Sequence, residues 1–213
     1  MTKVVTIDGP AASGKSTVSR ELARRMGWNW VSTGAFYRGL AFVAKEKGID
    51  FLNEEAIADL ANSKEWKVVL THERTEVEYG GHFVTDEIAQ DSVGQLASLI
   101  SKYKKVRERL LQNQRDCKIG VSGLVAEGRD CGTVVFPNAD VKIYLTANQE
   151  QRAERRAKEL GVSVESMINS QEVRDKQDSQ RKIAPLQIPE NAIVIDTTDM
   201  SLDYVVKLIE AKV

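Results

Sequence analysis

The pattern G-x-x-x-x-G-K-[ST], the spacing of a phosphate-binding loop, occurs near the start of the chain at residues 9–16. Glycines let the backbone pass close to a phosphate, and N–H groups at the start of the next helix point at the anion. The Lys15 ammonium can reach the β- and γ-phosphates, and the Ser16 hydroxyl can ligate Mg²⁺. The residues expected to hold a nucleoside triphosphate, ATP, are Gly9, Pro10, Ala11, Ala12, Ser13, Gly14, Lys15, Ser16 and Thr17.

The segments on either side of this loop support the assignment. Residues 3–8 are mostly apolar and β-branched, which is typical of a buried strand. Residues 15–26 have the apolar spacing of a helix, which Gly27 is expected to end. The alternative is an accidental match, a glycine-rich turn without function. A strand before the loop and a helix after it argue against that alternative.

Two further polar segments follow predicted strands. In residues 32–38, Thr33 can cap a helix or contact a ligand, and Arg38, one turn later, can reach an acceptor phosphate. Residues 127–133 place Arg129 and Asp130 between two glycines, at the carboxyl end of a predicted strand, where backbone approaches ligands. The alternatives are a solvated arginine on a capped surface helix and a structural ion pair in a tight turn.

A segment rich in arginine and lysine covers residues 149–182. Many of its charges are expected to form ion pairs along helix surfaces, but we expect Arg174 and Arg181 to belong to a lid over bound phosphates. Phosphoryl transfer depends mainly on positioning and charge neutralisation. A phosphate acceptor, whose second pKa is about 6, needs no general base. Arginines with few histidines therefore fit a kinase that acts on a nucleoside monophosphate.

The elements that must position these residues alternate between strand and helix. The predicted strands are 3–8, 29–32, about 121–127, 140–145 and 192–196. The predicted helices are 15–26, about 36–47, the region 86–115, 149–160, 164–176 and about 201–212. This order predicts an α/β fold, a five-stranded parallel sheet with helices on both faces and ligands at the carboxyl ends of the strands.

Residues 51–85 interrupt this alternation. A short helix is expected to start near residues 53–55, and strands are expected at 66–70, 76–79 and 82–84, the last two joined by a Gly-Gly turn. This small antiparallel sheet is too small for an independent domain. We therefore predict one domain, 1–213, with a core of 1–50, 100–148 and 183–213. An inserted acceptor-side subdomain is expected at about 51–99, and the helical lid at about 149–182.

The composition is that of an ordinary globular protein, with 42% hydrophobic and 29% charged residues and a formal net charge of −1. This charge argues against a nucleic-acid binder, and no apolar run is long enough for a membrane span. Cys117 and Cys131 lack the spacing of a zinc site or a redox pair, and His72 and His82 are expected at the surface. We expect a cytoplasmic monomer without a signal or transit peptide.

The chain carries four motifs in a fixed order. They are the phosphate loop after Ile7-Asp8, T-G-x-x-Y-R at 33–38, E-G-R-D-x-G-T-V-V-F-P at 127–137 and R-x-x-A-P-L at 181–186. Together they resemble the bacterial-type cytidylate kinases, which are P-loop nucleoside monophosphate kinases. The resemblance spans nearly the whole chain and implies transfer of the γ-phosphate of ATP to CMP or dCMP. Thr33 stands where a serine is common in this family, and Ser179-Gln180 stands where many of its members carry a more basic or Asn-containing run.

The resemblance also implies roles for individual residues. Spacing alone would place Ser98, Arg107 and Asp178 on exposed helix faces. By resemblance, the CMP phosphate is held by Thr33, Arg38, Arg129 and Arg181, the cytosine by Ser98, Arg107 and Asp130, and the ribose by Arg174 and Asp178. The implied catalytic residues are Lys15, Arg129, Asp130, Arg174 and Arg181, and the implied metal ligand is Ser16.

The cytosine assignment agrees with the chemistry of the base. Asp130 can accept a hydrogen bond from the N4 amino group while Arg107 donates to the ring, whereas uracil reverses these groups. Each mismatch costs about 1–3 kcal/mol, so CMP and dCMP should be preferred over UMP. One alternative is a kinase for another nucleotide or small acceptor, such as shikimate. Another is a regulatory GTP-binding switch. Such a protein usually recognises guanine with an Asn-Lys-x-Asp motif after a late strand, and residues 140–142 and 191–192 do not supply that motif.

Overall fold

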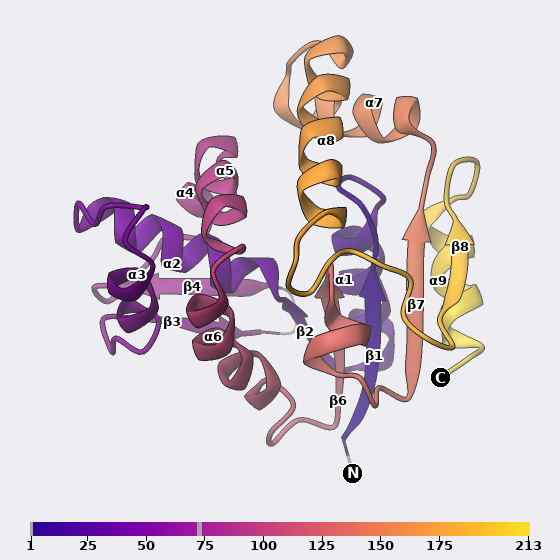
Figure 1. Cartoon of the computed structure of the whole chain (residues 1–213). Helices are drawn as coiled ribbons and strands as arrows, with labels where there is room; N and C mark the ends of the chain where they lie inside the picture. Colours follow the sequence, from indigo (N-terminus) through magenta and orange to yellow (C-terminus); the bar gives the residue numbers. More distant parts are fainter. Residues whose placement is uncertain (1, 72–73) are drawn as a thin grey trace.

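The computed structural model of the chain describes residues 2–71 and 74–213 (Figure 1). Its strands are β1 (Lys3–Asp8), β2 (Asn29–Ser32), β3 (Trp66–Leu70), β4 (Thr75–Tyr79), β5 (His82–Phe83), β6 (Gly123–Gly128), β7 (Val141–Thr146) and β8 (Ile193–Asp196). Its helices are α1 (Lys15–Met26), α2 (Gly34–Glu46), α3 (Glu54–Leu60), α4 (Thr85–Ala89), α5 (Asp91–Ile100), α6 (Lys104–Asp116), α7 (Gln149–Leu160), α8 (Val164–Ser179) and α9 (Leu202–Glu210), with a π-helical turn, η1 (Cys131–Val135).

Five strands form one parallel sheet in the order β2-β6-β1-β7-β8, as predicted. The register aligns the carboxyl ends of three of them, because Asp8 of β1 pairs with Gly128 of β6, and Glu127 of β6 pairs with Ser32 of β2. The loops that follow these strands therefore begin side by side at one edge of the sheet. This edge brings together segments that lie about a hundred residues apart in the chain.

Helices cover both faces of the sheet, which confirms the predicted layers. Alternate side chains of a strand point to opposite faces. Val5 and Ile7 of β1 pack into one core with α1 and α9, whereas Val4 packs into the other core with Leu40 of α2 and Leu110 of α6. Gly27 ends α1 with a φ of 64°.

The interruption at residues 51–85 contains the expected short helix, α3, and a three-stranded antiparallel sheet in the order β3-β4-β5. The predicted helical region 86–115 is three helices, α4, α5 and α6. Gln90 separates α4 from α5 with extended angles (φ −57°, ψ 146°), and Tyr103 precedes α6 in a similar conformation. The proposed division into core, insertion and lid remains a prediction.

The helices α7 and α8 lie side by side at the carboxyl edge of the parallel sheet (Figure 1). They share a small core of Ala153, Ala157 and Met167. In Figure 1, α8 lies between α5 and α7 and descends toward α1, so residues near its carboxyl end approach the loops that follow β1 and β6. The segment predicted as a lid thus contributes side chains to the same edge of the sheet.

The remaining expectations concern single residues. His82 is exposed, as predicted, whereas His72 lies outside the described residues. Cys117 is a half-buried free thiol and Cys131 a fully buried one. Within residues 2–71 and 74–213, none of the helices combines the length and the apolar character needed to cross a bilayer.

Candidate active site

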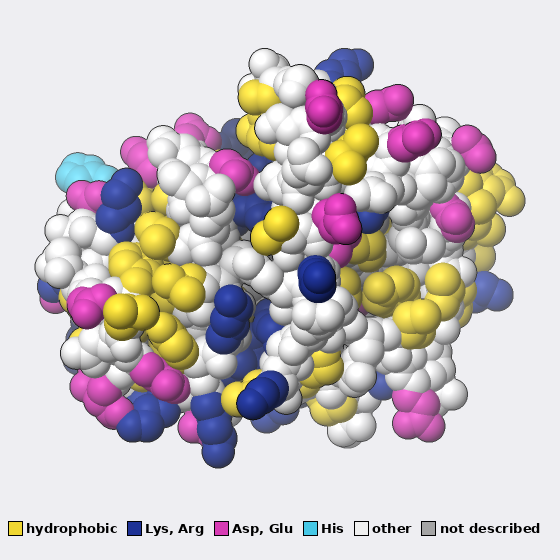
Figure 2. Space-filling view, turned by 45° about the horizontal axis from the view of Figure 1, so that its top comes forward, with side chains coloured by type: hydrophobic (Ala, Val, Ile, Leu, Met, Phe, Trp, Pro, Cys, Tyr) yellow, Lys and Arg dark blue, Asp and Glu magenta, His cyan; other side chains and the backbone are white. Residues whose placement is uncertain are grey.

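A pocket of about 560 Å³ opens where β1, β2 and β6 end, between the phosphate loop, α5 and α8. Lys and Arg side chains surround the hollow in the middle of the face that Figure 2 shows. Of the sequence-predicted residues, the pocket is lined by Ala11, Ala12, Ser13, Gly14, Lys15, Ser16, Thr17, Thr33, Arg38, Ser98, Arg129, Asp130, Arg174, Asp178 and Arg181. The fold therefore brings nearly all of the predicted donor and acceptor residues to one cavity.

The phosphate loop leaves β1 in a conformation that glycine makes possible. Gly9 has a φ of 150°, and a Cβ on it would lie 2.0 Å from the carbonyl oxygen of Leu145 on the neighbouring strand. Ala12 and Gly14 also have positive φ values, 56° and 88°. Helix α1 then begins at Lys15, so its free N–H groups and the positive end of its dipole face the pocket.

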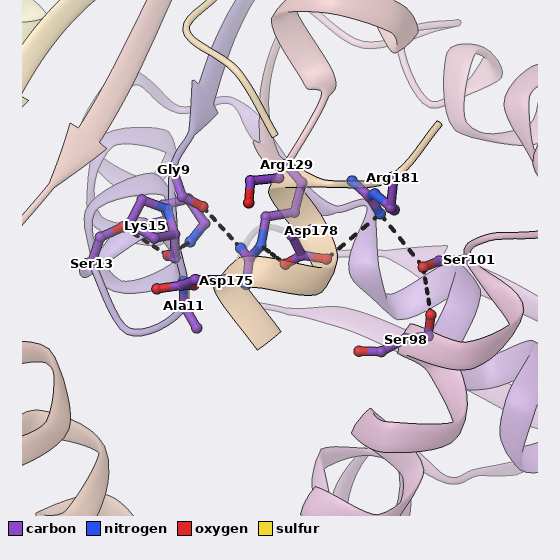
Figure 3. Close-up of polar contacts among 12 residues, drawn as sticks. Gly9, Ala11, Ser13, Lys15, Ser98, Ser101, Arg129, Asp175, Asp178 and Arg181 are labelled. Atoms are coloured by element: carbon purple, nitrogen blue, oxygen red, sulfur yellow. Dashed lines mark hydrogen bonds and ion pairs between the residues drawn. The ribbon is translucent and has the colours of Figure 1, made fainter. Parts of the chain in front are cut away.

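Lys15 lies inside this loop and is only 5% exposed. Its Nζ donates to the carbonyl oxygen of Pro10 at 2.5 Å (Figure 3). Burial, followed by the charge of Arg129, lowers the pKa of Lys15 to about 7. A buried ammonium next to a guanidinium favours an anion at its side, and a bound triphosphate would supply that charge.

The Ser16 hydroxyl donates to Oε1 of Glu127 at 2.9 Å. Glu127 stands near the carboxyl end of β6 and is buried, yet it lines the pocket. A hydroxyl beside a carboxylate suits Mg²⁺, which prefers oxygen ligands and keeps several waters. The sequence motif indicates Ser16 alone. Glu127 belongs to the 127–137 motif, and its place beside Ser16 follows from the pairing of β1 with β6.

Arg129 connects the phosphate loop to α8. Its Nη1 donates to the carbonyl oxygen of Gly9 at 3.0 Å, and its Nε donates to Oδ2 of Asp178 at 2.7 Å (Figure 3). Asp178 is 9% exposed, so the expectation from spacing that it is an exposed helix residue is wrong. The turn after β6 therefore places the Arg129 guanidinium between the phosphate loop and α8.

Arg181 lies on the other side of Asp178. Its Nη1 is 3.7 Å from Oδ1 of Asp178 and 3.5 Å from the hydroxyl oxygen of Ser101. The Arg181 side chain is only 6% exposed. Among the described residues, its Nε and Nη2 have no hydrogen-bond partner. Buried guanidinium nitrogens without partners are costly, so this arrangement favours an anionic ligand.

Arg107 and Asp130 form a buried ion pair. The Arg107 guanidinium carbon also lies 5.4 Å from the ring centroid of Tyr37, and its Nη1 donates to the Ser101 carbonyl at 3.2 Å. Spacing predicted an exposed Arg107, but the residue is 7% exposed, because α6 turns it toward the sheet. Asp130 lines the pocket, whereas Arg107 stands behind it and is not one of the lining residues.

Arg38 and Arg174 meet above α5. Arg38 Nη1 donates to the carbonyl oxygens of Ile88 at 2.5 Å and Gln90 at 3.1 Å. Arg174 Nη2 is 3.3 Å from Oδ1 of Asp91. Burial, followed by the charge of Arg174, lowers the pKa of Arg38 to about 10. The two positively charged guanidinium groups therefore lie close together, and an anion bound between them would reduce their repulsion.

Two polar residues at the pocket are held by backbone groups. Thr33 precedes α2 at the N-cap position, but its hydroxyl does not cap the helix; it donates to the Glu127 carbonyl at 3.0 Å. This bond ties β2 to β6 at the carboxyl edge. The Ser98 hydroxyl donates to the Gly94 carbonyl at 3.0 Å within α5, and its side chain lines the pocket.

Two residues that contact the apex of the phosphate loop belong to no sequence motif. The Ala11 N–H donates to Oδ1 of Asp175 at 3.1 Å, and Arg152 Nη1 donates to the Ala11 carbonyl at 3.0 Å. Arg152 also pairs with Asp175 at 2.5 Å. In the sequence, Arg152 is one of many basic residues of the segment 149–182, and only the packing of α7 and α8 on the loop distinguishes it.

The fold and the loop define the class of this protein, an α/β protein with the P-loop kinase fold. Two solved structures agree with this fold. An uncharacterized protein from Eubacterium ventriosum has a TM-score of 0.54 at 13% identity, with 99% of this chain and 97% of that chain covered. A gluconokinase from Sinorhizobium meliloti has a TM-score of 0.50 at 13% identity, with coverage of 99% and 90%. At these identities the likeness shows the fold alone.

Sequence comparisons are more specific. The family model described as cytidylate kinase matches residues 5–213. A cytidylate kinase from Bdellovibrio bacteriovorus is 58% identical over 206 residues, which cover 97% of this chain and 95% of that protein. A cytidylate kinase from Pseudomonas fluorescens is 44% identical over 217 residues, with coverage of 99% and 94%. The chain belongs to the cytidylate kinase family.

Proposed function

We propose that this protein transfers the γ-phosphoryl group of ATP to CMP or dCMP, giving ADP and CDP or dCDP. The observation that carries the proposal is the single pocket in which a complete phosphate loop faces arginines from α2, the β6–η1 turn, α8 and the segment after α8. Family membership supports cytidine nucleotides as acceptors over shikimate or another small acceptor. It likewise supports catalysis over a regulatory GTP-binding switch.

The donor nucleotide would be held by the phosphate loop. Backbone N–H groups at the start of α1 and the Lys15 ammonium would bind its phosphates, with Ser13, Gly14, Ser16 and Thr17 along the same wall. The lowered pKa of Lys15 would rise again next to a phosphate, which keeps the ammonium charged when ATP is bound. Ser16 and Glu127 would hold Mg²⁺, which neutralises charge on the donor phosphates.

The acceptor phosphate would lie among Arg38, Arg129 and Arg181, within reach of Thr33. Arg129 contacts both the phosphate loop and Asp178, which supports a role between donor and acceptor. The unpartnered nitrogens of Arg181 point to the same requirement for an anion. These cations would hold two negatively charged phosphates close together, which is the main task in phosphoryl transfer.

The base and the ribose would occupy the rest of the pocket. Asp130 would accept from the N4 amino group of cytosine with the support of Arg107, and Ser98 would contribute from α5. Burial raises the pKa of Asp130, while the neighbouring Arg107 opposes this shift and favours the carboxylate. Arg174 and Asp178 would contact the ribose side.

Residues 149–182 would act as a lid. Arg174 on α8 reaches across to Asp91 on α5, a contact that supports closure of this segment over the pocket. Closure would exclude water, which otherwise competes as an acceptor of the phosphoryl group. We further propose that the protein acts as a cytoplasmic monomer, which a measurement of its mass in solution would test.

A parallel turnover assay with CMP, dCMP, UMP, AMP and GMP, each with ATP and Mg²⁺, tests the proposed function. CMP and dCMP should be phosphorylated with kcat/KM roughly a hundred-fold above that for UMP, because two mismatched polar contacts cost about 1–3 kcal/mol each. Comparable kcat/KM for UMP and CMP would contradict the base site. Tight GTP binding without phosphate transfer would contradict the kinase proposal itself.

A further inference from the structure

Helix α5 has a glycine, Gly94, near its amino end that its backbone does not require. Gly94 is buried and lies inside the helix, where φ is negative for all residue types. Glycine is less favourable than alanine at such a position, because it loses more backbone entropy on folding. The explanation for the glycine must therefore lie in the space around it.

That space is occupied by the two arginines that meet above α5. A Cβ on Gly94 would lie 2.3 Å from Nη2 of Arg174 and 2.6 Å from Nη2 of Arg38. The two side chains come from different elements, α8 and α2. The missing methyl group of Gly94 thus allows a guanidinium from the core and one from the proposed lid to reach the same point on the pocket wall.

We propose that Gly94 is a positioning residue for the acceptor nucleotide. By leaving this space free, it lets Arg38 and Arg174 converge on the phosphate and ribose of CMP, and it lets α8 approach α5 closely. The inference rests on the proposed function, because it assigns these two arginines to the acceptor. It adds a residue that contacts the arginines and acts through them.

Replacement by alanine separates folding from binding. The atoms that a Cβ would meet are the far ends of flexible side chains, so they can move aside without disturbing the backbone. Helix α5 itself gains a better helix former. The variant should therefore fold at least as well as the parent protein while it holds Arg38 and Arg174 in displaced positions.

The test compares Gly94→Ala with the parent protein and with Ser92→Ala, a control on an exposed position of the same helix. We expect Gly94→Ala to weaken CMP binding at least ten-fold by titration calorimetry. The Kd for ATP should stay within two-fold, and Tm should not fall. In the turnover assay, KM for CMP should rise more than kcat falls. A Kd for CMP within two-fold of the parent value, or an equal loss for both nucleotides together with a lower Tm, would overturn the proposal.

A second measurement tests whether Gly94 acts through the arginines. In a variant that already carries Arg38→Gln and Arg174→Gln, the same Gly94→Ala change should alter CMP affinity less than two-fold, because the two guanidinium groups that the Cβ would displace are absent. A full ten-fold loss in that background would also overturn the proposal. If the parent protein itself fails to bind CMP but binds another nucleoside monophosphate, the proposed function fails, and the same variants are then measured with that nucleotide.

Discussion

The proposed donor and acceptor halves of the pocket are built in different ways. The proposed donor half is lined by one continuous segment, residues 11–17 of the phosphate loop and α1, and it offers mainly backbone N–H groups and the end of a helix. The acceptor half takes side chains from α2, α5, the β6–η1 turn, α8 and the segment after it, over residues 33–181. A local backbone site can be recognised from a short motif, whereas a dispersed side-chain site depends on how separate elements pack.

Replacing Lys15 with alanine should have the largest effect, because it removes the one side-chain cation inside the donor loop. We expect kcat/KM to fall about 10³-fold, or about 4 kcal/mol, with a circular dichroism spectrum like that of the parent protein. CMP affinity should change little, since the acceptor half is separate. Lys207→Ala, at an exposed helix position, is the matched control. A Lys15→Ala variant that keeps most of its activity would contradict the proposal that Lys15 binds the donor phosphates.

Arg129 lies between the halves, so its replacement tests how sharply they are divided. Arg129→Met should lower kcat/KM about 10²-fold, mainly through a higher KM for CMP. The variant also leaves Asp178 without its 2.7 Å partner, which adds to the loss. Steady-state kinetics with each substrate varied in turn give the measurement. An increase confined to KM for ATP would contradict the acceptor role of Arg129 and indicate that it binds the donor nucleotide.

Asp130→Asn should change the preference of the acceptor half for cytosine over uracil without changing ATP binding. The asparagine amide can donate to O4 of uracil, which the carboxylate repels. We expect the preference for CMP over UMP to shrink about ten-fold, while KM for ATP stays within two-fold. Asp116→Asn, a substitution at the end of α6, serves as control. Unchanged selectivity would show that another residue reads the base.

Asp8 is the last residue of β1, directly before the phosphate loop, and should make a smaller, pH-dependent contribution to the stability of the fold. Its two oxygens accept from the N–H groups of Cys131 and Gly132, at 2.8 and 2.7 Å. Burial nevertheless raises the pKa of Asp8 from 3.8 to about 6. A raised carboxyl pKa means that the folded state binds the proton more tightly. The stabilisation by this group is therefore complete below pH 3.8 and is lost as pH rises through 6.

Between pH 5 and pH 7, Asp8 should thus lose about 1 kcal/mol of its contribution to the free energy of unfolding. Asp8→Asn removes this titration, so the difference in stability between variant and parent should shift by that amount in favour of the variant. Urea unfolding of both proteins at the two pH values provides the measurement. A difference that does not depend on pH would contradict the shifted pKa.

The parallel sheet was predictable because each strand is a short apolar run between polar turns, and the phosphate loop because its motif is contiguous. The helical region 86–115 was harder. Its apolar spacing continues through Gln90 and Tyr103, and only extended backbone at these two residues divides it into three helices. Spacing alone places Arg107 and Asp178 on exposed helix faces, and only the family resemblance assigns them to the site. The structure buries them because each has a partner of opposite charge.

By itself, the sequence determined the phosphate loop, the alternation of strands and helices, and the types of residue available for the proposed acceptor site. Only the tertiary structure decided that Asp175 and Arg152 bind Ala11, that Glu127 reaches Ser16, and that Gly94 makes room for two arginines. The physical reason is distance along the chain. Local patterns reflect backbone geometry over a few residues, whereas these contacts arise when strand register and helix packing bring remote segments within a few ångströms.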